Sequence, residues 1–255
     1  IIIKTELKNM PTAFHVHSTE WGRSGGHGSE TVSKIEYLAA QSADRIITVS
    51  HAMKDDLARH GWPEGKIDVV WNAVEPERYA PEGVQGEDVQ RLKERYRIEG
   101  DEQVILFVGR LTWIKGVRNL VQAMPLILNE FPKTRLVILG RGEEQKDIME
   151  LAQRLGVSDR MVYRFEFVSE SERILHYALA DVCVFPSFYE PFGIVSLEAM
   201  AMEKPVVVGA KGVSGFREQV VPSEPDQCGV HIDGERADDV AFGVREVLRD
   251  PERAK

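Results

Sequence analysis

Cysteine is scarce in this sequence. The two thiols, Cys183 and Cys228, lie among apolar neighbours, and the chain has no C-x-x-C spacing. A disulfide framework or a thiolate metal site needs more cysteines at closer spacing. We therefore expect both thiols to be reduced and buried, in a protein of the cytoplasm.

Long apolar runs and an excess of basic charge are also missing. No run approaches the roughly 20 apolar residues of a membrane helix, which excludes a transmembrane segment and leaves peripheral membrane contact open. The formal net charge is −9 at pH 7, whereas nucleic-acid-binding proteins present a concentrated basic face. We expect no nucleic-acid partner, and any anion site must be a local cationic pocket.

The sequence also lacks an initiator methionine and a signal-peptide pattern. It opens with IIIKTELKNMPTAFHVHS, and its last residues, DPERAK, read as the start of another helix. These ends predict a piece of a longer chain, truncated at its last helix.

From about residue 104 the sequence alternates between short apolar runs and polar, helix-like segments. The runs are VILFVG, RLVILG, MVYRFEFV, DVCVFPS and PVVVGA, with CGVHI as a sixth candidate. Apolar strands without polar alternation are typical of a parallel sheet buried on both faces, joined by right-handed crossover helices. This region therefore predicts a doubly wound, Rossmann-like α/β domain.

Residues 1–75 show a shorter version of the same pattern. The strand candidates TAFHVH, RIITVS and KIDVVWN are separated by helical stretches near 29–42 and 51–60. Three strands are too few for a complete domain. The segment VEPERYAPEGVQGEDVQ is rich in proline, glycine and acids, so we place a boundary there, with one domain at 1–80 and the other at 81–255.

The loop after the first strand of the second domain carries two cations. Ligands of open parallel sheets bind beyond the carboxyl ends of the strands. The loop VGRLTWIKG places Arg110 and Lys115 there, with Gly109 and Gly116 beside them. Two such cations bind a diphosphate, arginine as a planar fork and lysine as a mobile point charge. The alternative is a pair of solvated surface charges.

Two later loops are rich in glycine. VILGRGEE has Gly140 and Gly142 but lacks the third glycine of the dinucleotide fingerprint, which disfavours a nicotinamide-dependent dehydrogenase. VVVGAKGVSGFREQV has Gly209, Gly212 and Gly215. Either loop brings backbone amides close to a phosphate, or simply makes a tight turn.

The stretch FYEPFGIVSLEAM places Glu190 in a loop and Glu198 in the early part of the following helix. Amides at the helix start, near Gly193, bind hydroxyl oxygens or anions, and carboxylates accept hydrogen bonds from sugar hydroxyls. The two acids therefore suit a polyhydroxyl ligand. The alternative is one glutamate at a helix dipole and one on the surface.

AFHVHSTEWGR ends its strand with His15 and His17 on one face. Because no further histidine or cysteine cluster completes a ligand set, we expect no metal site. A histidine that hydrogen-bonds into the cleft is expected, and a buried structural histidine is the alternative.

The segments GRLTWIKGVRNLVQAMP, LVILGRGEE, ADVCVFPSFYEPFGIVSLEAMAMEKPVVV and VSGFREQV together resemble the C-terminal domain of retaining glycosyltransferases of family four, relatives of glycogen and starch synthases. The resemblance covers nearly all of residues 100–250. FHVHSTEWGR, ADRIITVSHAMKDDL and KIDVVWNAVEPERY resemble the family's N-terminal domain and linker. The resemblance implies a GT-B fold of two Rossmann-like domains, the first incomplete here. It also implies transfer of a sugar from a nucleoside diphosphate to an acceptor with retained anomeric configuration.

The resemblance assigns roles to individual residues. Arg110 and Lys115 would hold the donor diphosphate without a metal or other cofactor. Glu190 would lie near the donor sugar and Glu198 on the ribose hydroxyls, while His17 would hydrogen-bond the transferred sugar. The predicted catalytic set is His17, Arg110, Lys115 and Glu190, and the predicted donor-binding set is Gly109, Arg110, Lys115, Gly140, Glu190, Phe192, Gly193, Ile194 and Glu198.

Departures from the family keep alternatives open. The family's first strand and glycine-rich loop would precede residue 1, and Ala73 and Ser214 stand where the family commonly has glycine. One alternative is a nucleotide-sugar-binding module without turnover, and another is an epimerase or phosphorylase on the same fold. Glucose from UDP or ADP is the first candidate donor. The acceptor, a sugar, glucan or other hydroxyl compound, and the oligomeric state are not determined by the sequence.

Overall fold

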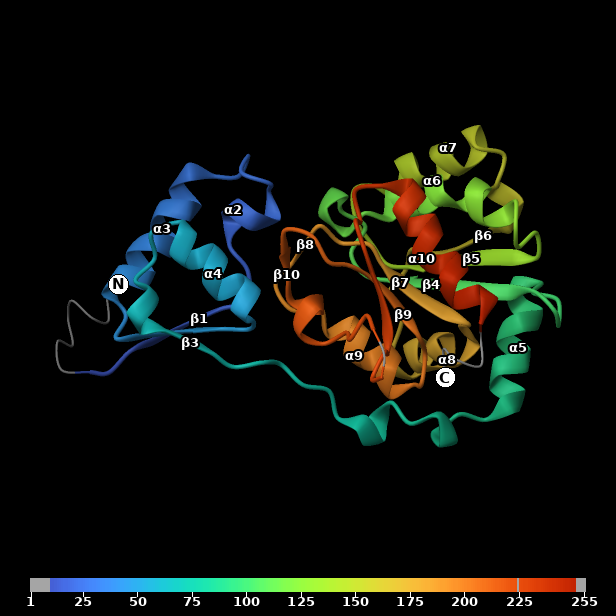
Figure 1. Cartoon of the computed structure of the whole chain (residues 1–255), viewed down its shortest axis with the longest axis horizontal. Helices are drawn as coiled ribbons and strands as arrows, with labels where there is room; N and C mark the ends of the chain where they lie inside the picture. Colours follow the sequence, from blue (N-terminus) through green and yellow to red (C-terminus); the bar gives the residue numbers. More distant parts are fainter. Residues whose placement is uncertain (1–9, 224, 251–255) are drawn as a thin grey trace.

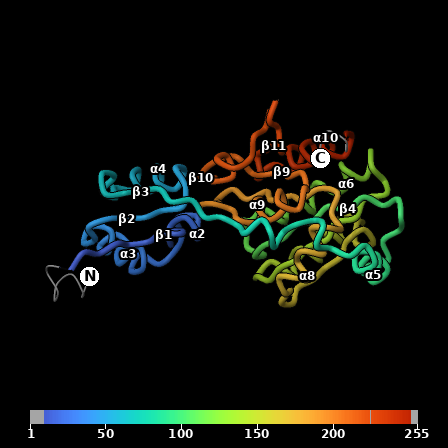
Figure 2. Tube along the Cα trace, turned by 90° about the horizontal axis from the view of Figure 1, so that it is seen from below, coloured from blue at the N-terminus to red at the C-terminus, as the bar shows by residue number. Residues whose placement is uncertain are grey.

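A computed structural model describes residues 10–223 and 225–250. These residues form two parallel α/β units, one with a three-stranded sheet and one with a six-stranded sheet (Figure 1). A long connection leaves the smaller unit after β3 and runs along the outside of the molecule to α5, as both views show (Figures 1 and 2). The structure is therefore an α/β protein in which each unit has its own main sheet, with a further two-stranded pair beside them.

The smaller unit contains the three strands expected from the sequence, in the order β1-β2-β3. Its elements are β1 (Ala13–Val16), α2 (Glu20–Arg23), α3 (Glu30–Ser42), β2 (Arg45–Thr48), α4 (His51–Arg59), η1 (Glu64–Lys66) and β3 (Ile67–Val69). Serines begin the two longer helices, since the Ser29 side chain accepts a hydrogen bond from the Val32 amide and Ser50 accepts one from Met53. These caps fix where α3 and α4 start.

The larger unit contains all six expected strands, in the order β11-β9-β7-β4-β5-β6, and every neighbouring pair is parallel. They are β4 (Gln103–Val108), β5 (Thr134–Leu139), β6 (Met161–Arg164), β7 (Val182–Phe185), β9 (Val206–Gly209) and β11 (Gly229–Ile232). The strand predicted at MVYRFEFV is shorter than expected and ends at Arg164. The neighbouring strand β5 ends at Leu139, which pairs with Arg164, so residues 165–168 have no β5 backbone to pair with. Phe167, in this segment, is 76% exposed.

Helices cover both faces of the larger sheet, as continuous apolar strands require. Ile105 and Phe107 of β4 pack on one face, against α6 (Val117–Leu128), α7 (Gln145–Arg154) and α10 (Ala237–Arg249). Val104 and Leu106 pack on the other, against α5 (Gly86–Tyr96), α8 (Glu170–Leu179) and α9 (Ile194–Ala201). Within the described part of the chain, no helix combines the length and apolarity needed to cross a membrane.

The connection between the units contains two short 3₁₀ helices, η2 (Pro76–Arg78) and η3 (Pro81–Gly83). The predicted boundary falls between them and stays a prediction. The other short elements are η4 (Trp113–Lys115), η5 (Ser158–Arg160), η6 (Gly215–Glu218), and the paired strands β8 (Tyr189–Glu190) and β10 (Val213–Ser214). The β8–β10 pair belongs to the larger unit and faces the smaller one (Figure 1).

Candidate donor-sugar site

The larger sheet reverses its strand order between β4 and β7. After β4 the chain adds β5 and β6 on one side, and it then adds β7, β9 and β11 on the other. The loops that leave β4 and β7 therefore diverge and open a crevice at the carboxyl ends of the strands, where doubly wound sheets bind their ligands. The loop after β4 carries Arg110 and Lys115, and the loop after β7 carries Glu190.

Lys115 and Glu190 meet across this crevice. Lys115 Nζ lies 2.5 Å from Glu190 Oε2, and the two side chains are only 15% and 10% exposed. Ser187 Oγ also donates to Glu190 Oε2, at 3.3 Å. Gly116 allows this approach, because its φ is 68° and a Cβ there would lie 2.2 Å from the Pro186 carbonyl oxygen. The crevice therefore holds a largely desolvated cation beside a carboxylate.

The Pro-Phe-Gly turn after Glu190 leads directly into α9. Gly193 is the N-cap residue with φ of 89°, and a Cβ there would lie 2.1 Å from Cε1 of Phe216. Only glycine fits this position. The turn therefore presents the start of α9, where backbone N–H groups lack helical partners, beside Lys115 and Glu190.

A cavity of about 410 Å³ joins these loops to the smaller unit. Seven predicted site residues line it, namely His17, Arg110, Lys115, Glu190, Phe192, Gly193 and Ile194. A smaller cavity of about 170 Å³ beside it adds Gly109. The structure therefore brings the predicted catalytic set to one place, although His17 lies on the other unit.

The cavity also has lining residues that the sequence interpretation missed. Ser18, Arg23 and Asn72 contribute from the smaller unit. Arg23 Nη1 donates to Ser18 Oγ at 2.8 Å, and its Nη2 lies 3.2 Å from Glu20 Oε2, so its guanidinium is held in place. Ser18 and Asn72 follow the ends of β1 and β3, so the strand-end rule applied to the larger unit could have found them.

His17 lies beside His15 at the end of β1, on the same face as predicted. Their ring centroids are 4.2 Å apart. Partial burial, together with the neighbouring His15, lowers the pKa of His17 from its ordinary value of 6.5. The imidazole of His17 is therefore biased toward its neutral form, which both donates and accepts hydrogen bonds.

Glu198 is surrounded by protein donors. Its carboxylate accepts hydrogen bonds from Tyr79 Oη at 2.9 Å, Tyr177 Oη at 2.7 Å and the Arg173 guanidinium at 3.1 Å. Burial raises the pKa of Tyr79 to about 12, with Arg173 opposing and Glu198 reinforcing the shift. Glu198 is not among the described residues that line either cavity, so its ribose role stays a prediction.

Gly140 also lies outside the described lining of both cavities. A Cβ at Gly140 would lie 1.8 Å from the Gly109 carbonyl oxygen, and one at Gly142 would lie 2.1 Å from that of Leu111. Close approach to the loop after β4 thus accounts for both glycines without a ligand. The role of Gly140 in donor binding stays a prediction.

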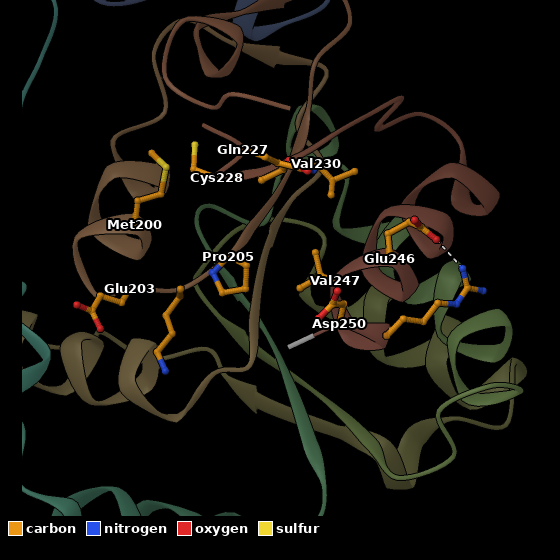
Figure 3. A pocket seen from close by; sticks show the side chains of 12 residues that line it. Met200, Glu203, Pro205, Gln227, Cys228, Val230, Glu246, Val247 and Asp250 are labelled. Atoms are coloured by element: carbon orange, nitrogen blue, oxygen red, sulfur yellow. Dashed lines mark hydrogen bonds and ion pairs between the residues drawn. The ribbon is translucent and has the colours of Figure 1, made fainter. Parts of the chain in front are cut away.

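A second cavity of similar size, about 390 Å³, lies at the amino ends of β9 and β11 (Figure 3). Pro205, Cys228 and Val247 contribute to its wall, as do Glu246 and Arg249, which are hydrogen-bonded to each other. Ligands of doubly wound sheets bind at the opposite ends of the strands. We therefore place the functional site at the cavity of Lys115 and Glu190.

Among residues 10–223 and 225–250, no group of three or more histidine, cysteine, aspartate or glutamate side chains is arranged to hold a metal ion. The expectation that no cofactor is required remains a prediction. Positive charge at the site comes from Arg110 and Lys115, both on the loop after β4, and from Arg23, which is paired with Glu20 within the smaller unit.

Comparison with known families decides the classification. The family described as "Glycosyl transferases group 1" matches residues 88–255, and "Glycosyltransferase Family 4" matches residues 2–78. The chain belongs to the group 1 glycosyltransferases. This confirms the resemblance seen in the sequence, and the two parallel α/β units make up a partial GT-B fold.

Individual relatives agree with this family. The chain is 38% identical to an uncharacterised glycosyltransferase of Methanocaldococcus jannaschii, over 94% of this chain and 61% of the relative. It is 30% identical to a glycogen synthase of Mycobacterium tuberculosis, over 100% of this chain and 58% of the relative. The chain thus spans about three fifths of the length of these curated relatives, 61% and 58%.

A solved structure shows the same fold. HepE of Anabaena in complex with UDP-glucose superposes with a TM-score of 0.83 at 23% identity, covering 99% of this chain and 66% of that one.

Proposed function

We propose that the protein is a retaining glycosyltransferase that moves a hexose, with glucose as the first candidate, from a nucleoside diphosphate sugar to a hydroxyl acceptor. The observation that carries this proposal is the pairing of Lys115 with Glu190 in a cavity that His17 also lines. A cation for the diphosphate and a carboxylate for the sugar are thus adjacent at the switch point of the sheet. Family membership and the UDP-glucose bound by HepE support the donor class.

In this proposal, catalysis relies on electrostatic stabilisation. Arg110 and Lys115 bind the diphosphate and stabilise the negative charge that develops as the sugar–oxygen bond breaks, a role that other transferases give to a metal ion. Glu190 and the amides of Phe192 and Gly193 hold the hydroxyls of the donor sugar. The neutral imidazole of His17 hydrogen-bonds the same sugar from the smaller unit.

The Lys115–Glu190 ion pair leaves donors of Lys115 for a second partner when the donor substrate binds. Lys115 Nζ has three N–H donors, and a diphosphate would take those that Glu190 does not use. The lysine therefore neutralises the carboxylate before binding and links the sugar end of the donor to its diphosphate end afterwards.

The free thiols Cys183 and Cys228 support a cytoplasmic location as part of this proposal.

Calorimetric titration with UDP, ADP, GDP and NAD tests the donor site. We expect saturable binding of one nucleoside diphosphate and none of NAD, with the affinity clearly reduced in Lys115→Ala. Product analysis with the matching nucleotide sugar then tests the reaction, because a transferase forms a new glycosidic bond. An epimerised donor or a sugar phosphate would contradict the proposal.

A nucleotide-sugar-binding unit without turnover is the second candidate. Donor binding without any product, from the chain supplied with sugar and glucan acceptors, would favour this candidate over the transferase.

A further inference from the structure

Helix α4 begins at the boundary between the two units, and it lacks an acidic residue of its own in the first turn. The other helices of the smaller unit have one, at Glu20 in α2 and Glu30 in α3. A helix N-terminus carries partial positive charge and backbone N–H groups that need acceptors. A negative group from elsewhere in the molecule would therefore stabilise the start of α4.

Glu218, the last residue of η6 in the larger unit, supplies this group. Its Oε2 accepts a hydrogen bond from the His51 amide at 3.0 Å, and its Oε1 accepts one from the Ala52 amide at 2.8 Å. Trp71, at the start of the connection between the units, donates its Nε1–H to Glu218 Oε2 at 2.9 Å. One carboxylate thus holds both α4 and the connection.

The N-cap of α4 makes a second bond across the same boundary. Ser50 Oγ donates to the Pro191 carbonyl oxygen at 2.5 Å while it accepts from the Met53 amide at 3.0 Å. Pro191 follows Glu190, and β8 is joined to η6 through the pairing of Ser214 with Glu190. The start of α4 therefore rests on the two segments that shape the turn of the site.

We propose that Glu218 is a positioning residue that holds the smaller unit in register over the donor cavity. By capping α4 from the larger unit, it fixes the distance between His17 on one wall and the Lys115–Glu190 pair on the other. The geometry rests on the contacts of Glu218 and Ser50, whereas its importance for the reaction rests on the proposed function. Removal of the carboxylate should loosen the placement of the smaller unit on the larger one without changing either sheet, because the shared apolar cluster of Ile114, Tyr189 and Val213 still holds the units together.

The test measures the distance between the units. Spin labels at Glu30→Cys on α3 and Lys146→Cys on α7 occupy side chains that are 82% and 85% exposed. The expectation that both thiols are buried is right for Cys183 and wrong for Cys228, so Cys228→Ser removes the partly exposed native thiol. We expect a narrow distance distribution from double electron–electron resonance in the parent protein, and a broad or shifted one in Glu218→Ala and Glu218→Gln.

Two variants separate positioning from mere helix stability. Glu150→Gln is the control, because it removes a glutamate charge from an exposed ion pair with Lys146 on α7. In this control protein Lys146 is kept and the second label is placed at Gln153→Cys on the same helix. The distance distribution should then stay narrow. His51→Asp combined with Glu218→Gln returns a charge to the first turn of α4 from its own helix. This double variant should regain stability toward urea but not the narrow distribution.

A distribution that stays narrow in Glu218→Ala overturns the proposal. If Glu218→Ala is unfolded, as judged from its far-UV circular dichroism signal, Glu218→Gln is measured in its place. A narrow distance distribution in Glu218→Gln then overturns the proposal. Recovery of the narrow distribution in the His51→Asp, Glu218→Gln protein would also overturn it, because helix stability alone would then set the distance. Failure of the proposed function is distinct, since it appears as absence of nucleoside diphosphate binding in the parent protein, whatever the distances are.

Discussion

The two α/β units differ in how completely each builds its own core. The six-stranded unit buries two extensive clusters, one on each face of its sheet. The cluster of the three-stranded unit is smaller and borrows Ile114, Tyr189 and Val213 from the larger unit. Helix α3 leaves Ile35 and Leu38 55% and 53% exposed. The smaller unit therefore depends on the larger one for part of its stability.

The two units also differ in the chemistry they bring to the cavity. The larger unit contributes Arg110, Lys115 and Glu190, which suit the charged part of a donor. The smaller unit contributes His17 and Arg23, the latter already bonded within its own unit. We infer that nucleotide affinity depends on the larger unit and that the sugar end of the donor depends on both.

Matched core substitutions should produce the largest effects. Ile138 in β5 and Ile46 in β2 are both fully buried. Ile138→Ala should lower the free energy of unfolding by about 4 kcal/mol and Ile46→Ala by about 2 kcal/mol, because the cavity at Ile46 lies in a small cluster that relaxes more easily. Urea denaturation followed by circular dichroism measures both losses. Equal losses would show that the two cores are equally rigid.

Removing the lysine at the site should have the next largest effect. Lys115→Ala should weaken nucleoside diphosphate binding by about 2–3 kcal/mol, roughly 30- to 150-fold, and leave the free nucleoside unaffected. Titration calorimetry measures both affinities. Lys146→Ala, on the exposed surface of α7, is the matched control. An equal loss for the nucleoside would contradict the assignment of Lys115 to phosphate.

Much of the fold follows from local patterns in the sequence. Each run of β-branched residues, from VILFVG to CGVHI, forms a strand, because such runs are stable only when buried on both faces. The site loops follow from the same reasoning, since ligands bind where strands end. The two-residue pair β8–β10 has no such signal, as it depends on backbone pairing between segments that are distant along the chain.

Contacts between distant segments explain what the sequence could not predict. Tyr79 lies 119 residues from Glu198, and Arg173 lies 25 residues away, yet both bond its carboxylate. The capping of α4 by Glu218 spans 167 residues. Neither contact leaves a periodic pattern in the sequence. A glutamate that binds a ligand therefore cannot be distinguished, from the sequence alone, from one that caps another helix.

Substitutions around Glu198 should have a moderate effect and test its role. Tyr79→Phe removes one hydrogen bond to the carboxylate and should cost about 1 kcal/mol of stability. Glu198→Gln should cost about 1–2 kcal/mol, since Arg173 loses its ionic partner but is partly exposed. If Glu198 holds the ribose, only Glu198→Gln should also weaken nucleoside binding. Unchanged nucleoside affinity in both variants would leave Glu198 with a structural role alone.

The smallest expected effect is a change in the titration of His17. Its pKa in the folded protein lies below the ordinary 6.5, so its contribution to stability is complete above that pH and declines as the pH falls below it. His15→Asn removes one cause of the shift and should raise the pKa of His17, as followed by the imidazole proton resonances in NMR.

The same titration separates the two units by function. If His17 contacts only the sugar, affinity for the nucleotide sugar should fall as His17 becomes protonated, while affinity for the nucleoside diphosphate should not follow this titration. Protonation removes the acceptor of the imidazole but leaves Arg110 and Lys115 charged. A diphosphate affinity that follows the pKa of His17, and moves with it in His15→Asn, would instead show that the smaller unit takes part in binding the phosphates.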